Sequence, residues 1–106
     1  MAMTTSQEYE YQAYMSKGRS YESSGDSYYN SKDYLTAKDR YFSAASAYDD
    51  AERIANSAGA YSEAREASNA SSNATSKARE CPYKYDQLVK EQERSDPYSK
   101  NYSPWR

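Results

Sequence analysis

The sequence predicts an all-α fold: three antiparallel helices, at about residues 7–29, 33–57 and 60–80, in a hairpin-like bundle with a short C-terminal helix and an extended tail. Two observations lead to this prediction. Tyrosine, alanine and glycine recur at spacings of three and four along most of the chain, which places them on one face of a helix. The pattern is interrupted at residues 30–33 and at Gly59, where the chain is expected to turn.

The amino-acid composition restricts what can form the core. The 106 residues include only five Leu, Ile, Val and Phe residues but 14 tyrosines. The formal net charge of −2 is too small for the self-repulsion that accompanies most disordered chains. The core must therefore consist of tyrosine and alanine. Alanine buries little area and a buried tyrosine hydroxyl needs a partner, so we expect a marginal monomer that is stabilised by contacts between copies.

The first predicted helix, residues 7–29, alternates large rings with glycines on one face. This face consists of Tyr11, Tyr14, Gly18, Tyr21, Gly25 and Tyr28. Each glycine lowers helix stability by about 1 kcal/mol relative to alanine, so its presence indicates close packing against a neighbour. The rings would act as knobs and the glycines as holes.

The second predicted helix, residues 33–57, has the strictest stripe. Asp33 is placed to cap its free backbone amides and to complement the helix dipole. The stripe alternates tyrosine with alanine and consists of Tyr34, Ala37, Tyr41, Ala44, Tyr48, Ala51, Ala55 and Ala58. This face is expected to pack against another helix.

The third predicted helix, residues 60–80, has only small side chains on its stripe, which allows close helix approach. They are Ala60, Ala64, Ala67, Ser71, Ala74, Ala78 and Cys81. Pro82 is expected to end this helix, because proline lacks an N–H group and clashes with the preceding turn. A short helix at about 85–94 would complete a single domain, residues 1–94. Pro97 and Pro104 then predict an extended arm at 95–106.

A weak internal repeat of 34 residues places Gly25 on Gly59. The positions Tyr21, Ser24, Gly25, Tyr28, Asp33, Tyr34, Ala37, Tyr41 and Ala44 together resemble one tetratricopeptide repeat, with tyrosine in place of its usual tryptophan and phenylalanine. The second copy is degenerate. The resemblance implies a helical hairpin that binds other proteins and has no catalytic activity. Three-helix microtubule-interacting and transport modules fit the number of helices equally well.

The sequence contains no pattern typical of an enzyme. It has no histidine and a single cysteine, so the commonest general base is missing and Cys81 alone cannot hold a structural zinc ion. Glycine-rich phosphate loops are also absent. The acid pairs Asp49/Asp50 and Glu63/Glu66 are interpreted as solvated helix surface. We therefore expect no catalysis, no cofactor and no metal.

Partners and location are predicted from charge and hydropathy. Lysines and arginines are scattered among equal or larger numbers of acids, which argues against a nucleic-acid partner. No apolar run is long enough for a membrane span. The first residues do not read as a signal peptide, so a cytoplasmic or virion-internal location is expected. An extracellular location stays open, because Asn69, Asn73 and Asn101 match the glycosylation acceptor pattern.

The leading functional hypothesis is a structural protein that assembles with itself, as a homo-oligomer or a filament. The alternative is an adaptor that receives another protein or a peptide in a groove between helices. Tyrosine and tryptophan are favoured in such contacts because they cover area with few rotatable bonds. The residues predicted to form packing or interface contacts are Tyr11, Tyr14, Tyr21, Tyr28, Tyr34, Tyr41, Tyr48, Tyr98, Tyr102 and Trp105.

Overall fold

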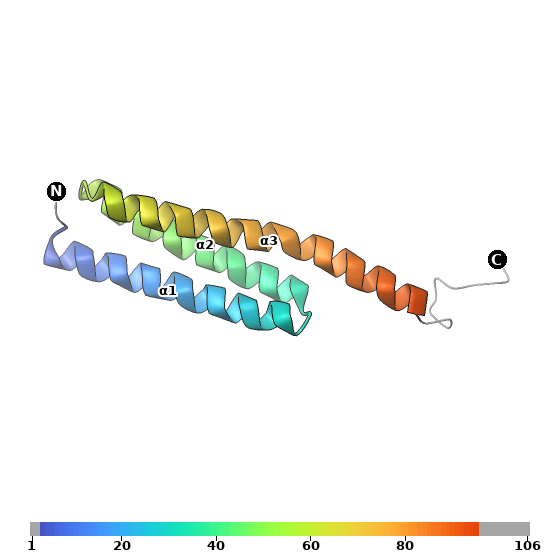
Figure 1. The fold of residues 1–106 in the computed structure, drawn as a ribbon. Coiled ribbons are helices and arrows are strands. Elements are labelled where there is room, and N and C mark those ends of the chain that lie inside the picture. Colours follow the sequence, from blue (N-terminus) through green and yellow to red (C-terminus); the bar gives the residue numbers. More distant parts are fainter. Residues whose placement is uncertain (1–2, 96–106) are drawn as a thin grey trace.

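The computed structural model describes residues 3–95, with side chains as far as residue 93. Three helices follow one another along the chain: α1 (Thr5–Asn30), α2 (Tyr34–Ser57) and α3 (Tyr61–Ser95). Short turns join them, so consecutive helices lie side by side and antiparallel in an elongated molecule (Figure 1). The predicted all-α fold of three antiparallel helices is confirmed.

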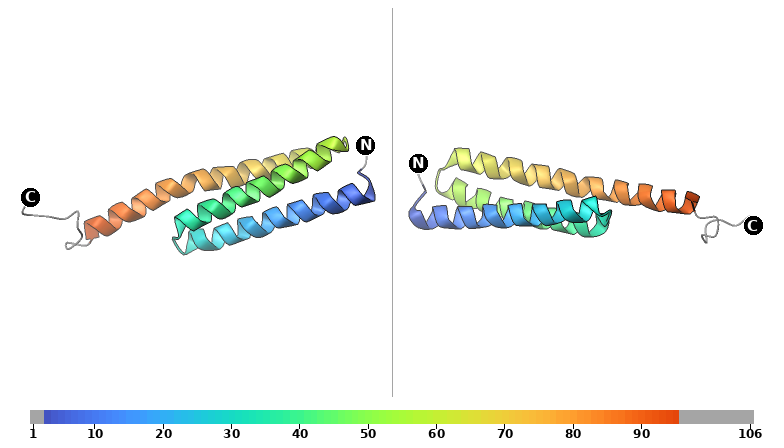
Figure 2. Two further views of the ribbon diagram at one scale, coloured as in Figure 1. Left: turned by 180° about the vertical axis from the view of Figure 1, so that it is seen from behind. Right: turned by 60° about the horizontal axis from the view of Figure 1, so that its bottom comes forward.

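The central helix is α2. It packs along its length against both α1 and α3, whereas α1 and α3 contact each other at few positions (Figure 2). Because α2 is covered on two sides, its buried arc is wider than the predicted stripe and also includes Ala45 and Ala47. The sequence pattern missed these two alanines because it assumed one packing partner for the helix.

The helix starts follow local capping chemistry. In α1, the Thr4 side chain accepts from the N–H of Gln7 at 3.1 Å, and the Gln7 side chain accepts from the N–H of Thr4 at 2.9 Å. This reciprocal pair satisfies two amides that the helix leaves without partners. In α2, the predicted cap is confirmed: the Asp33 side chain accepts from the N–H of Thr36 at 3.4 Å.

Rings from α2 sit directly on the glycines of α1. A Cβ atom added to Gly18 would lie 2.5 Å from Cε1 of Tyr48, and one added to Gly25 would lie 2.7 Å from the Tyr41 ring. No side chain fits at these two positions without displacing the ring. The glycines of α1 are therefore holes, as expected, but the knobs that fill them are rings of α2, not rings of α1.

The third stripe also packs as predicted. All seven of its members are buried: Ala60, Ala64, Ala67, Ser71, Ala74, Ala78 and Cys81. Their small size lets α3 approach α2 closely along its first two thirds. The interior of the described structure is therefore built almost entirely from tyrosine, alanine and glycine.

The prediction that Pro82 ends the third helix is wrong. α3 continues through Pro82 to Ser95 as one helix, so no separate fourth helix forms. Pro82 itself is exposed, so its ring does not disturb the packing of α3 against α2. The residues that follow include Lys, Gln, Leu and Glu, which favour helix and help it to continue. Apart from Ser95, which ends α3, the predicted arm at 95–106 lies outside the described residues.

The glycines that the 34-residue repeat superposes have different roles. Gly25 lies inside α1 and is buried against a ring of α2. Gly59 lies in the turn between α2 and α3 with φ 73°, a left-handed conformation that favours glycine. The repeat in the sequence therefore does not correspond to a repeated local structure at its glycines.

Candidate functional site

The tyrosines predicted as interface or packing residues fall into three groups. Tyr11, Tyr41 and Tyr48 are each only 2 % exposed and belong to the core. Four others are half-buried: Tyr14, Tyr21, Tyr28 and Tyr34. The remaining three predicted residues, Tyr98, Tyr102 and Trp105, lie outside the described residues. The buried and half-buried tyrosines thus serve mainly to hold the helices together.

Each of the two rings that cover a glycine also ends in a hydrogen bond to the same helix. The Tyr48 hydroxyl donates to Glu22 at 2.8 Å, and the Tyr41 hydroxyl donates to Asp26 at 2.5 Å. Both carboxylates belong to α1, one turn apart and next to the glycine holes. Each ring is therefore held by packing against a glycine and by the hydrogen bond from its hydroxyl to a carboxylate.

Two further tyrosines join α1 to α3, the helices whose backbones hardly meet. The Tyr11 hydroxyl lies 3.1 Å from both the backbone oxygen of Glu63 and the side chain of Glu66. The Tyr29 hydroxyl donates to Glu80 at 3.1 Å. These long side chains span the space between α1 and α3. The hydrogen bonds of their hydroxyls therefore connect the two outer helices.

Lys77 of α3 forms ion pairs with the two carboxylates of α1. Its ammonium group lies 2.7 Å from Glu22 and 3.4 Å from Asp26, and 5.5 Å from the centre of the Tyr41 ring. Burial lowers the pKa of Lys77, but the hydrogen bond and charge of Glu22, with those of Asp26, raise it more. The lysine therefore stays charged and supports the tyrosine contacts through their acceptors.

Burial and carboxylate partners raise the pKa of the core tyrosines. For Tyr11, desolvation and then the hydrogen bond to Glu66 raise the pKa to about 12. For Tyr41 and Tyr48, burial and the bonds to Asp26 and Glu22 raise the pKa well above its usual value. Because a tyrosinate cannot donate to a carboxylate, these contacts need protonated tyrosines.

Replacing Lys77 by methionine is expected to destabilise the protein by about 1 kcal/mol, since Glu22 and Asp26 lose their counter-charge while the apolar stem is kept. The ion pair is partly exposed, so the difference should shrink at high salt. Urea denaturation at low and high salt measures both effects. Lys17→Met, at an exposed position of α1, serves as the control. Equal stability of Lys77→Met and the parent at low salt would contradict this role.

Two of the acids interpreted as solvated surface also have structural partners. Asp49 is exposed but accepts from the Ser71 hydroxyl at 2.6 Å, which links α2 to α3. Glu66 is exposed and accepts from Tyr11. The sequence could not show these partners because they come from other helices.

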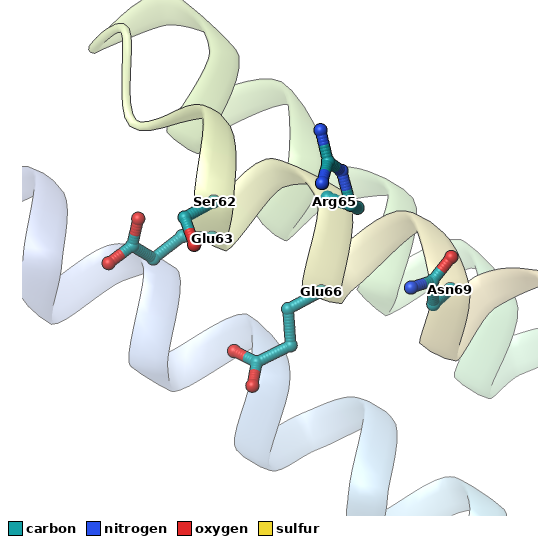
Figure 3. Close-up of a pocket in the computed structure, with 5 residues that line it drawn as sticks. All are labelled: Ser62, Glu63, Arg65, Glu66 and Asn69. Carbon is teal, nitrogen blue, oxygen red and sulfur yellow. The ribbon is translucent and has the colours of Figure 1, made fainter.

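The surface hollows are polar and shallow. A hollow of about 420 Å³ is lined by five residues of α3: Ser62, Glu63, Arg65, Glu66 and Asn69. Glu63 and Glu66 point toward α1, whereas Arg65 and Asn69 point away from it (Figure 3). Because these side chains point in different directions, they do not surround a ligand site in this hollow.

The single cysteine of the sequence lies inside the bundle. Cys81 is buried, its thiol donates to the backbone oxygen of Lys77 at 3.4 Å, and burial raises its pKa. It therefore serves as a small packing residue. Within residues 3–95, no three His, Cys, Asp or Glu side chains are placed to hold a metal ion.

The strongly hydrophobic residues of the chain lie outside the fully buried core. Leu35 and Phe42 are 44 % and 45 % exposed, and Ile54, Leu88 and Val89 are half-buried. These are all five Leu, Ile, Val and Phe residues of the sequence. Four tyrosines are exposed like Leu35 and Phe42: Tyr9, Tyr61, Tyr83 and Tyr85.

None of these exposed residues was among the predicted contacts. The prediction selected tyrosines that follow the helical stripes, whereas most of the exposed residues lie off the stripes. The sequence did contain a signal for these residues: they are large and apolar, but they do not lie on the buried stripe of their own helix. Leu35 and Phe42 show it most clearly, because their spacing of seven places both on one outer face of α2.

No known protein family, no curated protein and no solved structure matches this chain. Within the part of the chain that the structure describes, no helix is both long and apolar enough to cross a bilayer.

Proposed function

We propose that this chain is a non-enzymatic structural protein whose copies assemble with one another, into an oligomer or a filament. The observation that supports the proposal most is the position of its hydrophobic residues. None of the five Leu, Ile, Val and Phe side chains is fully buried, and Leu35 and Phe42 are nearly half exposed, while the fully buried core consists mainly of tyrosine and alanine. Exposed aromatic side chains such as Phe42 are enriched where proteins meet.

The thin interior supports the same proposal. An alanine side chain buries little apolar area, and each core tyrosine uses its hydroxyl to bind a carboxylate instead of adding more apolar contact. A fold of this kind gains more from additional burial between copies than one with a large aliphatic core.

A double variant tests the proposal. Replacing Leu35 and Phe42 by serine should leave the helix content unchanged, because both side chains are nearly half exposed, and should weaken self-association. Sedimentation velocity of the purified protein over a range of concentrations measures the association. Asp39→Ser, at an exposed position between the two, is the matched control. A parent chain that stays monomeric at every concentration would contradict the proposal.

The second candidate is an adaptor like a tetratricopeptide repeat, which binds another protein or peptide. The open arrangement of α1 and α3 on either side of α2 favours it, because helical hairpins of this shape can offer a groove. Tyr21, Tyr28, Tyr34 and Tyr41 are the residues that would line such a groove; Tyr41 is buried, and the other three are half-buried. An adaptor would remain monomeric without its partner, so the same sedimentation experiment separates the two candidates.

A further inference from the structure

The turn between α2 and α3 ends α2 with a common hydrogen-bond pattern. The N–H of Gly59 donates to the backbone oxygen of Asn56 at 3.0 Å, and the N–H of Ala60 donates to that of Ala55 at 2.8 Å. This pair of bonds defines the Schellman motif, in which one residue after the helix adopts a left-handed conformation. Gly59 has that conformation, with φ 73°. Glycine adopts it without steric cost, so this turn is relaxed.

The turn between α1 and α2, at the opposite end of α2, repeats this pattern with one difference (Figure 1). The N–H of Lys32 donates to the backbone oxygen of Tyr29 at 3.0 Å, and the N–H of Asp33 donates to that of Tyr28 at 2.9 Å. The left-handed residue here is Lys32, with φ 69°. A residue with a Cβ atom is strained in this conformation, which disfavours the closed turn by about tenfold relative to one with glycine. Of the two turns, the one that holds α1 is therefore strained.

Apart from this turn, α1 is held mainly by α2. The backbone of α1 approaches α3 at few positions, and long side chains make the polar contacts between these two helices: Tyr11, Tyr29 and Lys77. Residues 31–33 span about 10 Å when extended, which is about the distance between the axes of two packed helices. Opening of this turn would therefore release α1 as a whole helix without unfolding α2 or α3.

The face of α2 that α1 covers fits a helix of a particular kind. The Tyr41 ring leaves no room for a Cβ atom at Gly25. The Tyr48 ring leaves none at Gly18, and both hydroxyls donate to carboxylates of α1. A fitting helix thus presents two glycines seven residues apart, with carboxylates within one turn of them. The chain contains three glycines and the third lies in a turn, so among the described helices α1 is the one that fits. The α1 helix of a second copy fits equally well.

We propose that copies of this chain join by exchanging α1: the turn at residues 31–33 opens, and α1 of one copy packs on α2 of another. The contacts that α1 makes in the closed chain are re-formed between copies and the strain at Lys32 is lost, so exchange needs no new surface. Reciprocal exchange gives a closed dimer, whereas passing α1 to the next copy gives an open chain. This proposal rests on the self-assembly proposed above and names a route for it. The route does not use Leu35 and Phe42, which α1 leaves exposed.

Lys32→Gly tests the role of the strained turn in the full chain. Glycine relaxes the closed turn, so this variant should associate at least about tenfold more weakly than its parent in sedimentation equilibrium. The matched control is Ser31→Gly. Ser31 lies in the same turn with φ −90°, where glycine adds flexibility but relieves no strain, so the control should not associate more weakly. A Lys32→Gly variant that associates as strongly as its parent would overturn the proposal.

A mixing experiment tests whether α1 changes copies. Glu22→Lys places two lysines at the contact between α1 and α3, and Lys77→Glu places two glutamates there. In a mixed exchanged dimer, the two substituted positions face each other and the two unsubstituted ones face each other, so both contacts join opposite charges. Refolded together from urea, the two variants should therefore associate at least about tenfold more strongly than either alone in sedimentation equilibrium. Without exchange the contact stays within each copy, and mixing has no effect.

The outcomes separate exchange from self-assembly itself. Weaker association of Lys32→Gly together with stronger association of the mixture supports exchange. If the parent associates but neither the turn variant nor the mixing changes the association, the copies meet with α1 in place, so exchange is wrong and self-assembly stands. If the parent and the mixture both stay monomeric at every concentration, both proposals fail. If circular dichroism shows that either charge variant has lost its helices, Lys32→Gly decides alone, because it relieves strain in the folded chain.

Discussion

Replacing Gly18 and Gly25 together by alanine is expected to destabilise the protein by about 3 kcal/mol or more. Each added Cβ would lie within 2.7 Å of a ring carbon of Tyr48 or Tyr41. The rings cannot easily move away, because their hydroxyls are bonded to α1. The two helices must therefore separate, which removes contacts along the whole α1–α2 face.

The sign of this effect distinguishes packing from helix propensity. Propensity alone predicts that two glycine-to-alanine changes within a helix stabilise it by about 2 kcal/mol. Urea denaturation measures the difference directly. The matched control is Ser16→Ala with Ser20→Ala, at exposed positions of α1, which should be neutral or slightly stabilising. A glycine double variant more stable than its parent would show that the rings do not rest on the glycines.

Raising the pH above 10 is expected to unfold the protein over a narrow range. The pKa of Tyr11 is raised from 10.0 to about 12, and the pKa values of Tyr41 and Tyr48 are also raised. Between pH 10 and these raised pKa values, the unfolded chain has lost protons that the folded chain still holds. The free energy of unfolding therefore falls as the pH rises. Three such groups give a slope of about 4 kcal/mol per pH unit. The raised pKa of Lys77 acts in the same direction.

Two spectroscopic signals test this prediction in one titration. Tyrosinate absorbance reports the ionisation of the rings, and circular dichroism reports the helices. The core tyrosines should ionise only as the helical circular dichroism is lost. In Tyr48→Phe one of the three protons no longer contributes, so the slope of the unfolding free energy against pH should fall by about one third. Ionisation of all tyrosines in one step near pH 10, with the helices retained, would contradict the buried hydroxyl–carboxylate pairs.

The sequence predicted the helices well because their packing is periodic and local. The buried faces of the second and third helices, the cap at Asp33 and the close approach at Gly18 and Gly25 all follow from residue spacing. It failed at Pro82, where the intrinsic cost of proline is offset by helix-forming neighbours and by the packing of the preceding turns against α2.

The contacts between helices were less accessible from the sequence. Glu22, Asp26 and Lys77 are ordinary charged residues in the sequence, and only the register between helices brings them to the tyrosine hydroxyls. The exposed hydrophobic residues were also missed as contact candidates. A large side chain outside the stripe is covered only if a neighbouring helix packs on that face. Only the tertiary structure shows where the neighbouring helices lie.

The central claim is that tyrosine rings of α2 rest on glycines of α1 and hold these two helices together. Proton NMR of the full chain tests it most directly. The α-protons of Gly18 and Gly25 should be shifted strongly upfield by the ring currents of Tyr48 and Tyr41 and show nuclear Overhauser contacts to those rings. Glycine α-protons with ordinary helical shifts and no contact to any aromatic ring would contradict the claim.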